Sequence, residues 1–219
     1  MKILAVTDKV VDSIYSPRLG ERFGDIDLVL SCGDLPYSYL EFIVSTLNVP
    51  CFYVHGNHDC EEHMSCGLIL QAPGGWVNLD RRTVNFRGVL IGGLEGSIRY
   101  RPGPPYQYTE TEMRARIASM LPALLRNRLR YGRYLDILIT HSPPFGIQDG
   151  PDRAHRGFKA FLPFMARFRP RLLLHGHQHL YGREEQRAQF LDTEIINVYP
   201  YQVIEWQNGN MTNRLRKIS

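Results

Sequence analysis

Long hydrophobic runs and paired cysteines are both missing from this sequence. No apolar run approaches the ~18–20 residues of a membrane span, and the apolar start at 3–6 is too short for the core of a signal peptide. The four cysteines, Cys32, Cys51, Cys60 and Cys66, form no CxxC pair, which argues against a structural zinc site of the usual spacing. We therefore expect a cytoplasmic protein with free thiols and no membrane partner.

A strong charge of one sign is also absent. The 26 Lys and Arg residues and the 22 Asp and Glu residues give a formal net charge of +4. This mild excess permits an anionic substrate but does not predict the broad basic groove of a nuclease, so nucleic acid is not an expected partner. The chain has no internal repeat and no low-complexity linker, and 43% of its residues are hydrophobic. We expect a single domain over residues 1–219, and the sequence carries no signal of its oligomeric state.

Short apolar runs in this chain end repeatedly in polar residues. Five of them span residues 2–6, 28–31, 51–54, 137–140 and 172–174. Such runs, bounded by turn residues, are typical of strands that are buried on both faces. The functional site of an open α/β sheet lies outside the carboxyl ends of its strands, so we expect the residues after these runs to meet at one site. These residues are Asp8, Asp34, Asn57, His58, Asp59, His141, His177 and His179.

Helix-like and further strand-like stretches lie around these runs. Residues 39–47, 109–130 and 156–168 have apolar side chains near helical spacing, and the second of these begins with a Thr-Glu-Thr-Glu capping sequence. Residues 76–94 and 194–206 are rich in β-branched and aromatic side chains, which favours strands. The mixture indicates two sheets packed together with helices outside them.

The side chains at the strand ends are carboxylates, an amide and imidazoles, without a thiolate. This set suits Mn, Fe, Zn or Ni better than Ca or Cu(I). A carboxylate such as Asp34 can bridge two ions. Two ions ~3.5–4 Å apart can clamp a phosphoryl group during in-line attack.

Four motifs in this order resemble the calcineurin-like metallophosphoesterase superfamily. They are GD at 33–34, GNHD at 56–59, the isolated His141 after a strand, and GHQH at 176–179. The resemblance covers nearly the whole chain. It implies an α/β fold, a four-layer α-β-β-α sandwich of two mixed sheets flanked by helices, with a dinuclear metal site.

The resemblance also assigns metal ligands. It implies two divalent ions, among which manganese is favoured, with Asp34 as the bridging ligand. Three further side chains would complete one site: Asn57, His141 and His177. Two would belong to the other site: Asp8 and His179.

The activity implied by the resemblance is metal-dependent hydrolysis of a phosphoric ester, with phosphodiesters favoured over monoesters. A metal-activated hydroxide would attack phosphorus in a small phosphorylated substrate. His58 would be the general acid on the leaving oxygen, oriented by Asp59, and Asn57 would bind the substrate and help to neutralise its developing charge.

One position departs from the family pattern. The first motif is normally Asp-x-His, but here Val10 stands where the histidine is expected. We therefore expect the site of Asp8 and His179 to be the weaker one, unless Asp12 supplies a replacement ligand. The lost histidine is also the best support for an alternative, a catalytically weak or inactive protein-binding scaffold on the same fold.

Two loops are candidates for substrate contact. Residues 95–108 form a Pro/Gly-rich stretch whose arginines, Arg99 among them, could hold phosphate and whose tyrosines could stack on a base. Residues 142–158 follow His141 and contain His155, which could touch substrate phosphate.

Overall fold

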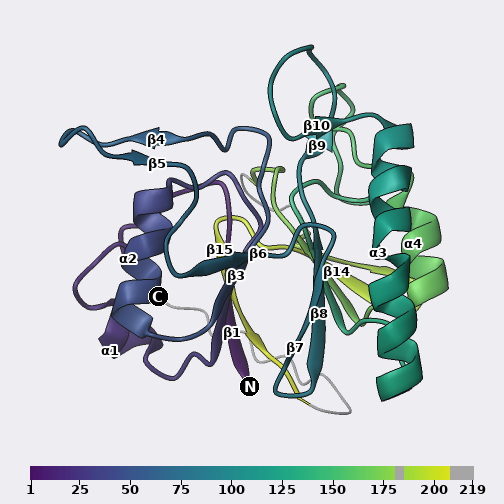
Figure 1. Cartoon of the computed structure of the whole chain (residues 1–219), viewed down its shortest axis with the longest axis horizontal. Helices are drawn as coiled ribbons and strands as arrows, with labels where there is room; N and C mark the ends of the chain where they lie inside the picture. Colours follow the sequence, from purple (N-terminus) through teal and green to yellow (C-terminus); the bar gives the residue numbers. More distant parts are fainter. Residues whose placement is uncertain (181–184, 208–219) are drawn as a thin grey trace.

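The structure, a computed structural model, describes residues 1–180 and 185–207 and contains two large sheets that face one another (Figure 1). In the first sheet every neighbouring pair is parallel except the antiparallel pair at the edge that the last strand forms. Its strands in spatial order are β15 (Tyr201–Glu205), β1 (Lys2–Val6), β2 (Leu28–Ser31), β3 (Cys51–Tyr53) and β6 (Trp76–Asn78).

The second sheet is also mixed, with four parallel strands in its centre and an antiparallel strand at each edge. Its strands in spatial order are β13 (Arg187–Phe190), β14 (Thr193–Asn197), β12 (Leu172–His175), β11 (Ile137–Thr140), β8 (Val89–Leu94) and β7 (Thr83–Phe86).

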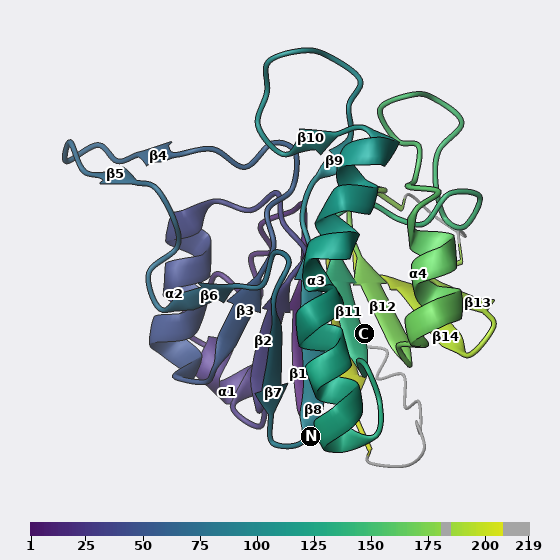
Figure 2. The ribbon, with the colours of Figure 1, turned by 45° about the vertical axis from the view of Figure 1, so that its right-hand side comes forward.

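Helices cover the outer face of each sheet. The first sheet is covered by α1 (Leu19–Phe23) and α2 (Tyr37–Leu47), and the second by α3 (Glu110–Tyr131) and α4 (Phe161–Phe168) (Figure 2). The layer order is therefore α-β-β-α, and the predicted four-layer sandwich is confirmed. None of the helices in the described ranges is long and apolar enough to cross a membrane.

The continuous apolar runs follow from this layering, because successive side chains of a strand point to opposite faces of its sheet. In β1, Ile3 and Ala5 enter the core between the two sheets, whereas Leu4 and Val6 pack against the helices outside. Both faces of the strand are dry, so both sets of positions are apolar.

Of the two longer predicted helices, one begins later in the chain than predicted and the other begins within one residue of its predicted start. The helix expected from residue 156 begins only at Phe161, because the residues before it form a loop in which the Asp149 carboxylate accepts a hydrogen bond from the backbone N–H of Gly157. The helix expected from residue 109 begins at Glu110, and Thr109 is its N-cap and forms a capping box with Glu112.

Two short pairs of strands extend beyond the sheets. A hairpin of β4 (Glu62–His63) and β5 (Ile69–Leu70) projects to one side of the molecule (Figure 1). The parallel pair β9 (Ser97–Ile98) and β10 (Gln107–Tyr108) forms the base of a loop that stands above the edge of the second sheet (Figure 2).

Candidate functional site

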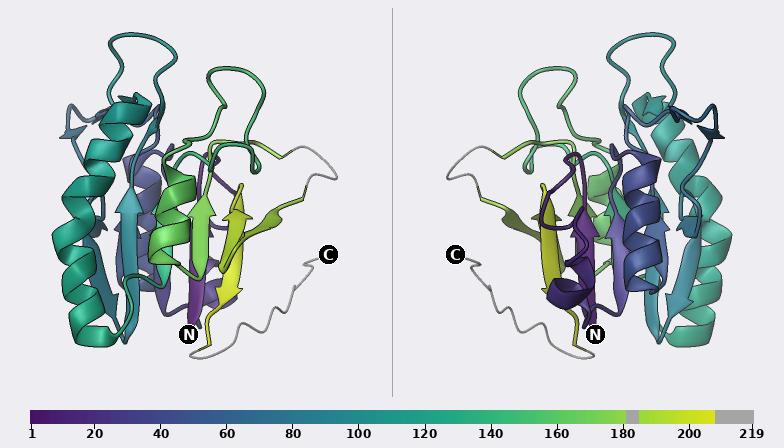
Figure 3. Two further views of the ribbon diagram at one scale, coloured as in Figure 1. Left: turned by 90° about the vertical axis from the view of Figure 1, so that its right-hand side faces the viewer. Right: turned by 90° about the vertical axis from the view of Figure 1, so that its left-hand side faces the viewer.

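The carboxyl ends of the central strands of both sheets meet at one edge of the sandwich, beneath two long loops (Figure 3). Asp8 lies two residues beyond β1 and Asp34 lies three residues beyond β2. His141 directly follows β11, and His177 lies two residues beyond β12. The two halves of the predicted site therefore come from different sheets and meet across the sandwich.

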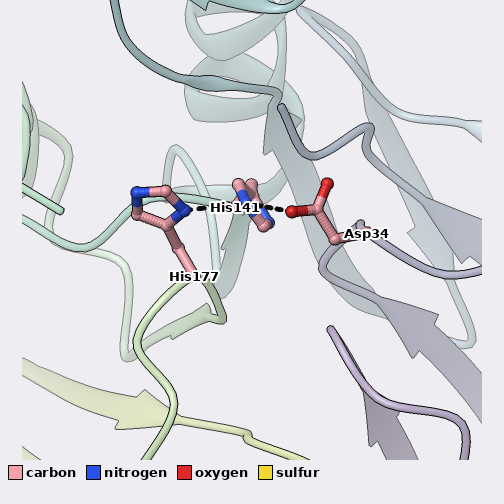
Figure 4. A group of neighbouring side chains, drawn as sticks. All are labelled: Asp34, His141 and His177. Carbon is pink, nitrogen blue, oxygen red and sulfur yellow. Dashed lines mark hydrogen bonds and ion pairs between the residues drawn. The ribbon is translucent and has the colours of Figure 1, made fainter. Parts of the chain in front are cut away.

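Three of the predicted ligands form a compact cluster. Asp34, His141 and His177 each place a ligand atom within 4.8 Å of the other two (Figure 4). His141 Nε2 lies 3.2 Å from Asp34 Oδ2 and 3.1 Å from His177 Nδ1. The amide oxygen of Asn57 lies 3.1 Å from the same His141 nitrogen. The structure thus brings together the four side chains predicted for one metal position.

Backbone carbonyls fix which nitrogen of each ring faces this position. His141 Nδ1 donates to the carbonyl oxygen of Cys32 at 2.8 Å, and His177 Nε2 donates to that of Ala154 at 2.7 Å. A neutral ring with one donor presents a lone pair on its other nitrogen. Two ring lone pairs, a carboxylate oxygen and an amide oxygen therefore converge, and a cation is what such a group of acceptors fits.

Without a cation, a proton has to take that place. Burial disfavours the charged form of His141, but the adjacent Asp34 carboxylate outweighs it and raises the pKa of His141 to about 9. Burial likewise opposes ionisation of Asp34, yet the charge of His141 and its hydrogen bond lower the pKa of Asp34 to about 2. Both shifts show that the ligand cluster favours a positive charge between Asp34 and His141.

The motif glycines make room for the ligands. A Cβ on Gly56 would lie 2.0 Å from Asp34 Oδ1 and 2.7 Å from His141 Cε1. A Cβ on Gly176 would lie 2.3 Å from Asp8 Oδ2. Gly176 therefore gives room to the Asp8 carboxylate, whereas the left-handed residue of this turn is His177, with φ 67°.

Asp8 and His179 form a second pair beside the cluster. Asp8 Oδ2 accepts a hydrogen bond from the backbone N–H of His177 at 2.9 Å, and Asp8 Oδ1 lies 3.5 Å from His179 Nε2. The hydrogen bond to Asp8 raises the pKa of His179. Within the described ranges, this pair does not join the three-residue cluster.

Val10 serves packing in this structure. It is partly buried against the core between the first sheet and its helices. Asp12, the possible replacement ligand, is exposed, and no contact of its carboxylate with the cluster occurs in the described part of the chain.

The two predicted catalytic residues lie in different surroundings. His58 is exposed, and its backbone N–H donates to Asp34 Oδ1 at 2.8 Å, which places the side chain at the rim of the cluster. Asp59 is buried, and its carboxylate accepts hydrogen bonds from the backbone N–H groups of Asp34, Leu35 and Gly56. Asp59 therefore supports the two motif loops, and its predicted orientation of the His58 ring stays a prediction.

Burial raises the pKa of Asp59, and the nearby charge of Asp34 raises it further. The three backbone hydrogen bonds compensate part of the cost of burying this carboxyl group.

The predicted substrate-binding residues also differ in position. The His155 ring lies 5.4 Å from that of His177, centroid to centroid, and is hydrogen bonded to Asp152 at 2.8 Å, so it borders the site. Arg99 instead donates to the carbonyl oxygen of Gln107 and to Glu112, at 3.1 and 2.9 Å. Arg99 thus links its loop to the first turn of α3.

One of the tyrosines of this loop, Tyr100, reaches Asn57, a contact that the sequence did not predict. The amide nitrogen of Asn57 donates to the hydroxyl of Tyr100 at 3.4 Å. No local signal distinguishes Tyr100 from its neighbours, because the strand pair at the base of the loop decides which side chain points inward.

Two solved structures share this architecture at low sequence identity. One solved structure has a TM-score of 0.62 at 15% identity, over 93% of this chain and 94% of its own. TT1561 of Thermus thermophilus has a TM-score of 0.59 at 15% identity, over 90% of this chain and 88% of its own. Calcineurin-like phosphoesterase YfkN from Bacillus subtilis has a TM-score of 0.46 at 14% identity, over 97% of this chain and 87% of its own.

At such identities the first two similarities show a shared fold alone. A comparison with curated proteins found no match. The sequence model of the calcineurin-like phosphoesterase family, however, matches residues 1–181, and the chain belongs to this family.

Proposed function

We propose that this chain is a metal-dependent phosphodiesterase that acts on a small phosphorylated substrate. The observation that carries the proposal is the convergence of acceptors from Asp34, Asn57, His141 and His177 on one position. Backbone carbonyls hold both imidazoles in the tautomer that a metal ligand needs. Family membership supports the hydrolysis of phosphoric esters.

The chain's own residues divide the work. Divalent ions at such sites supply an acidified water and charge neutralisation at phosphorus. The side-chain oxygen of Asn57 faces His141 in the ligand cluster, and its side-chain nitrogen faces the hydroxyl of Tyr100. His58, exposed at the rim, is the group that can protonate a leaving oxygen. His155 borders the same site and can contact a phosphoryl oxygen.

We propose two divalent ions, with manganese favoured. The cluster that contains Asp34, His141 and His177 is the tighter position. The pair of Asp8 and His179 is the weaker one, because Val10 cannot coordinate a metal and packs against the core.

The test is a comparison of two chromogenic substrates with the protein in excess Mn²⁺. Bis(p-nitrophenyl) phosphate should be hydrolysed with a higher kcat/KM than p-nitrophenyl phosphate, and Asp34→Asn should abolish both activities. Preference for the monoester would overturn the diester assignment. Activity that survives Asp34→Asn would show that another site, or a contaminant, performs the reaction.

The scaffold remains the second candidate, because Val10 and the separate Asp8–His179 pair weaken one metal position. A protein that binds manganese but hydrolyses neither substrate would favour this function.

A further inference from the structure

A proline-rich arch stands over the ligand cluster. We define the arch as residues 99–106, the segment between β9 and β10 (Figure 2). Its Tyr100 hydroxyl accepts a hydrogen bond from Asn57 Nδ2 at 3.4 Å, while Asn57 Oδ1 faces His141. The Tyr100 hydroxyl thus contacts the end of the Asn57 amide that faces away from the cluster, which places the Tyr100 side chain next to the site.

The arch is held in place from below. Gln107 is 2% exposed, and its side-chain oxygen accepts hydrogen bonds from the backbone N–H groups of Tyr100 and Arg101, at 3.3 and 3.4 Å. At its far end, Tyr106 stacks on the buried ring of His55, with centroids 4.2 Å apart. Three prolines, Pro102, Pro104 and Pro105, stiffen the segment between these anchors.

Arg101 is an exposed cation of the arch. Its guanidinium carbon lies 5.5 Å from the centroid of the Tyr100 ring. The hydrogen bonds and ion pairs of the described residues engage Arg99 but not the side chain of Arg101. The donors of Arg101 are therefore available to a ligand, one tyrosine side chain away from Asn57.

We propose that Arg101, held against Tyr100, determines specificity by binding a second anionic group of the substrate. A planar guanidinium binds phosphate oxygens with two parallel hydrogen bonds, and stacking on an aromatic ring limits its motion before binding. The substrate class is then a small phosphodiester that carries a further phosphoryl group. This inference rests on the proposed phosphodiesterase function.

The experiment uses two chromogenic esters that differ by one phosphate. They are the p-nitrophenyl ester of thymidine 5′-phosphate and the same ester with an added 3′-phosphate, each assayed with the full-length protein in excess Mn²⁺. Wild type should have a lower KM for the bisphosphate. Arg101→Ala should raise that KM at least about tenfold, the size expected for a charge-assisted pair, with kcat and the kinetics of the plain ester nearly unchanged.

Two further variants distinguish a direct contact between Arg101 and the added phosphate from a general effect of removing a positive charge. Arg101→Lys should restore part of the preference, because it keeps the charge and loses the fork. Arg130→Ala, at an exposed arginine of α3 stacked on Tyr131, should leave both esters unaffected. An equal loss of kcat/KM on both esters, or no loss on either, would overturn the role of Arg101.

A binding measurement keeps this inference distinct from the proposed function. Calorimetry of the metal-free protein should give a lower Kd for thymidine 3′,5′-bisphosphate than for thymidine 5′-phosphate, and Arg101→Ala should remove the difference. If wild type hydrolyses neither ester, the proposed function fails and this binding difference decides the inference. Equal Kd values in wild type would overturn it.

Discussion

His177 Nδ1 lies 3.1 Å from His141 Nε2, and the other ring nitrogen of each histidine donates a hydrogen bond to a backbone carbonyl oxygen. Two neutral rings in this arrangement point lone pairs at the same place. The folded protein should therefore be more stable with a cation between the two rings than without one. Without the cation, a buried proton has to be held between His141 and Asp34.

Metal binding should accordingly stabilise the folded protein. We expect excess Mn²⁺ to raise the midpoint temperature of thermal unfolding and a chelator to lower it. At a hundredfold excess of Mn²⁺ over its Kd, the unfolding free energy should increase by about 2.7 kcal/mol. Differential scanning calorimetry measures the shift. His141→Ala should lose the response, whereas His63→Ala, on the projecting hairpin, should keep it. A response unchanged in His141→Ala would place the metal elsewhere.

Gly56 should tolerate no side chain. In Gly56→Ala the new Cβ would lie 2.0 Å from Asp34 Oδ1, so the carboxylate or the loop has to move. We expect a loss of about 1–3 kcal/mol in unfolding free energy and a large loss of bound metal, measured by denaturant titration and elemental analysis.

The control for this substitution is Gly20→Ala in α1, where an added Cβ meets no atom within 4 Å. That variant should be at least as stable as wild type, because alanine favours a helix. A stable, fully metal-loaded Gly56→Ala would show that the close approach is not required.

His58 should act on the leaving group without holding metal. We expect His58→Ala to lower kcat by ~10²–10⁴-fold on a diester with an alkoxide leaving group, and less on one that releases p-nitrophenolate, with metal content nearly unchanged. Kinetics on the two esters and elemental analysis measure the two effects. Loss of metal would make His58 a ligand, and equal losses on both esters would contradict its role as an acid.

Much of this architecture follows from local sequence. The runs at 2–6 and 28–31 coincide with β1 and β2, because a strand covered on both faces has to be continuously apolar. The ligands could be placed together because the strand-end rule needs no knowledge of side-chain contacts.

Other features depend on distant contacts and could not be predicted. Residues 61–72 contain strands of two residues each, β4 and β5, which carry no periodic pattern. Arg99 and Tyr100 are neighbours, yet one pins the loop to Glu112 and the other reaches Asn57. Likewise, Asp59 is engaged by backbone N–H groups from a loop 25 residues away, which no local motif reveals.

Glu95 should make stability depend on pH in acid. Burial opposes its ionisation, but hydrogen bonds from His55 and Tyr108 and the charge of Arg116 outweigh it and lower the pKa of Glu95 below its ordinary value of 4.5. A lowered folded-state pKa stabilises the protein above the unfolded-state value, and this contribution is lost as pH falls through the folded-state pKa.

Wild type should therefore lose more unfolding free energy than Glu95→Gln when the pH falls from about 5 to about 3. Urea titrations at several pH values measure this, with Glu61→Gln, an exposed position, as the control. Parallel pH profiles for wild type and Glu95→Gln would contradict the prediction.

Val10 should leave one metal position weak. Asp8 and His179 remain 3.5 Å apart, but Val10 packs toward the helices, so water has to supply what an imidazole would. After exhaustive dialysis we expect one tightly held ion per chain, a second only in excess Mn²⁺, and activity that rises with that second ion. Elemental analysis of wild type, Val10→His and Val10→Ala measures this. Val10→His should retain more of the second ion, and Val10→Ala, which also empties the packing position, should not. Two equally tight ions in wild type would mean that another residue, such as Asp12, completes the site.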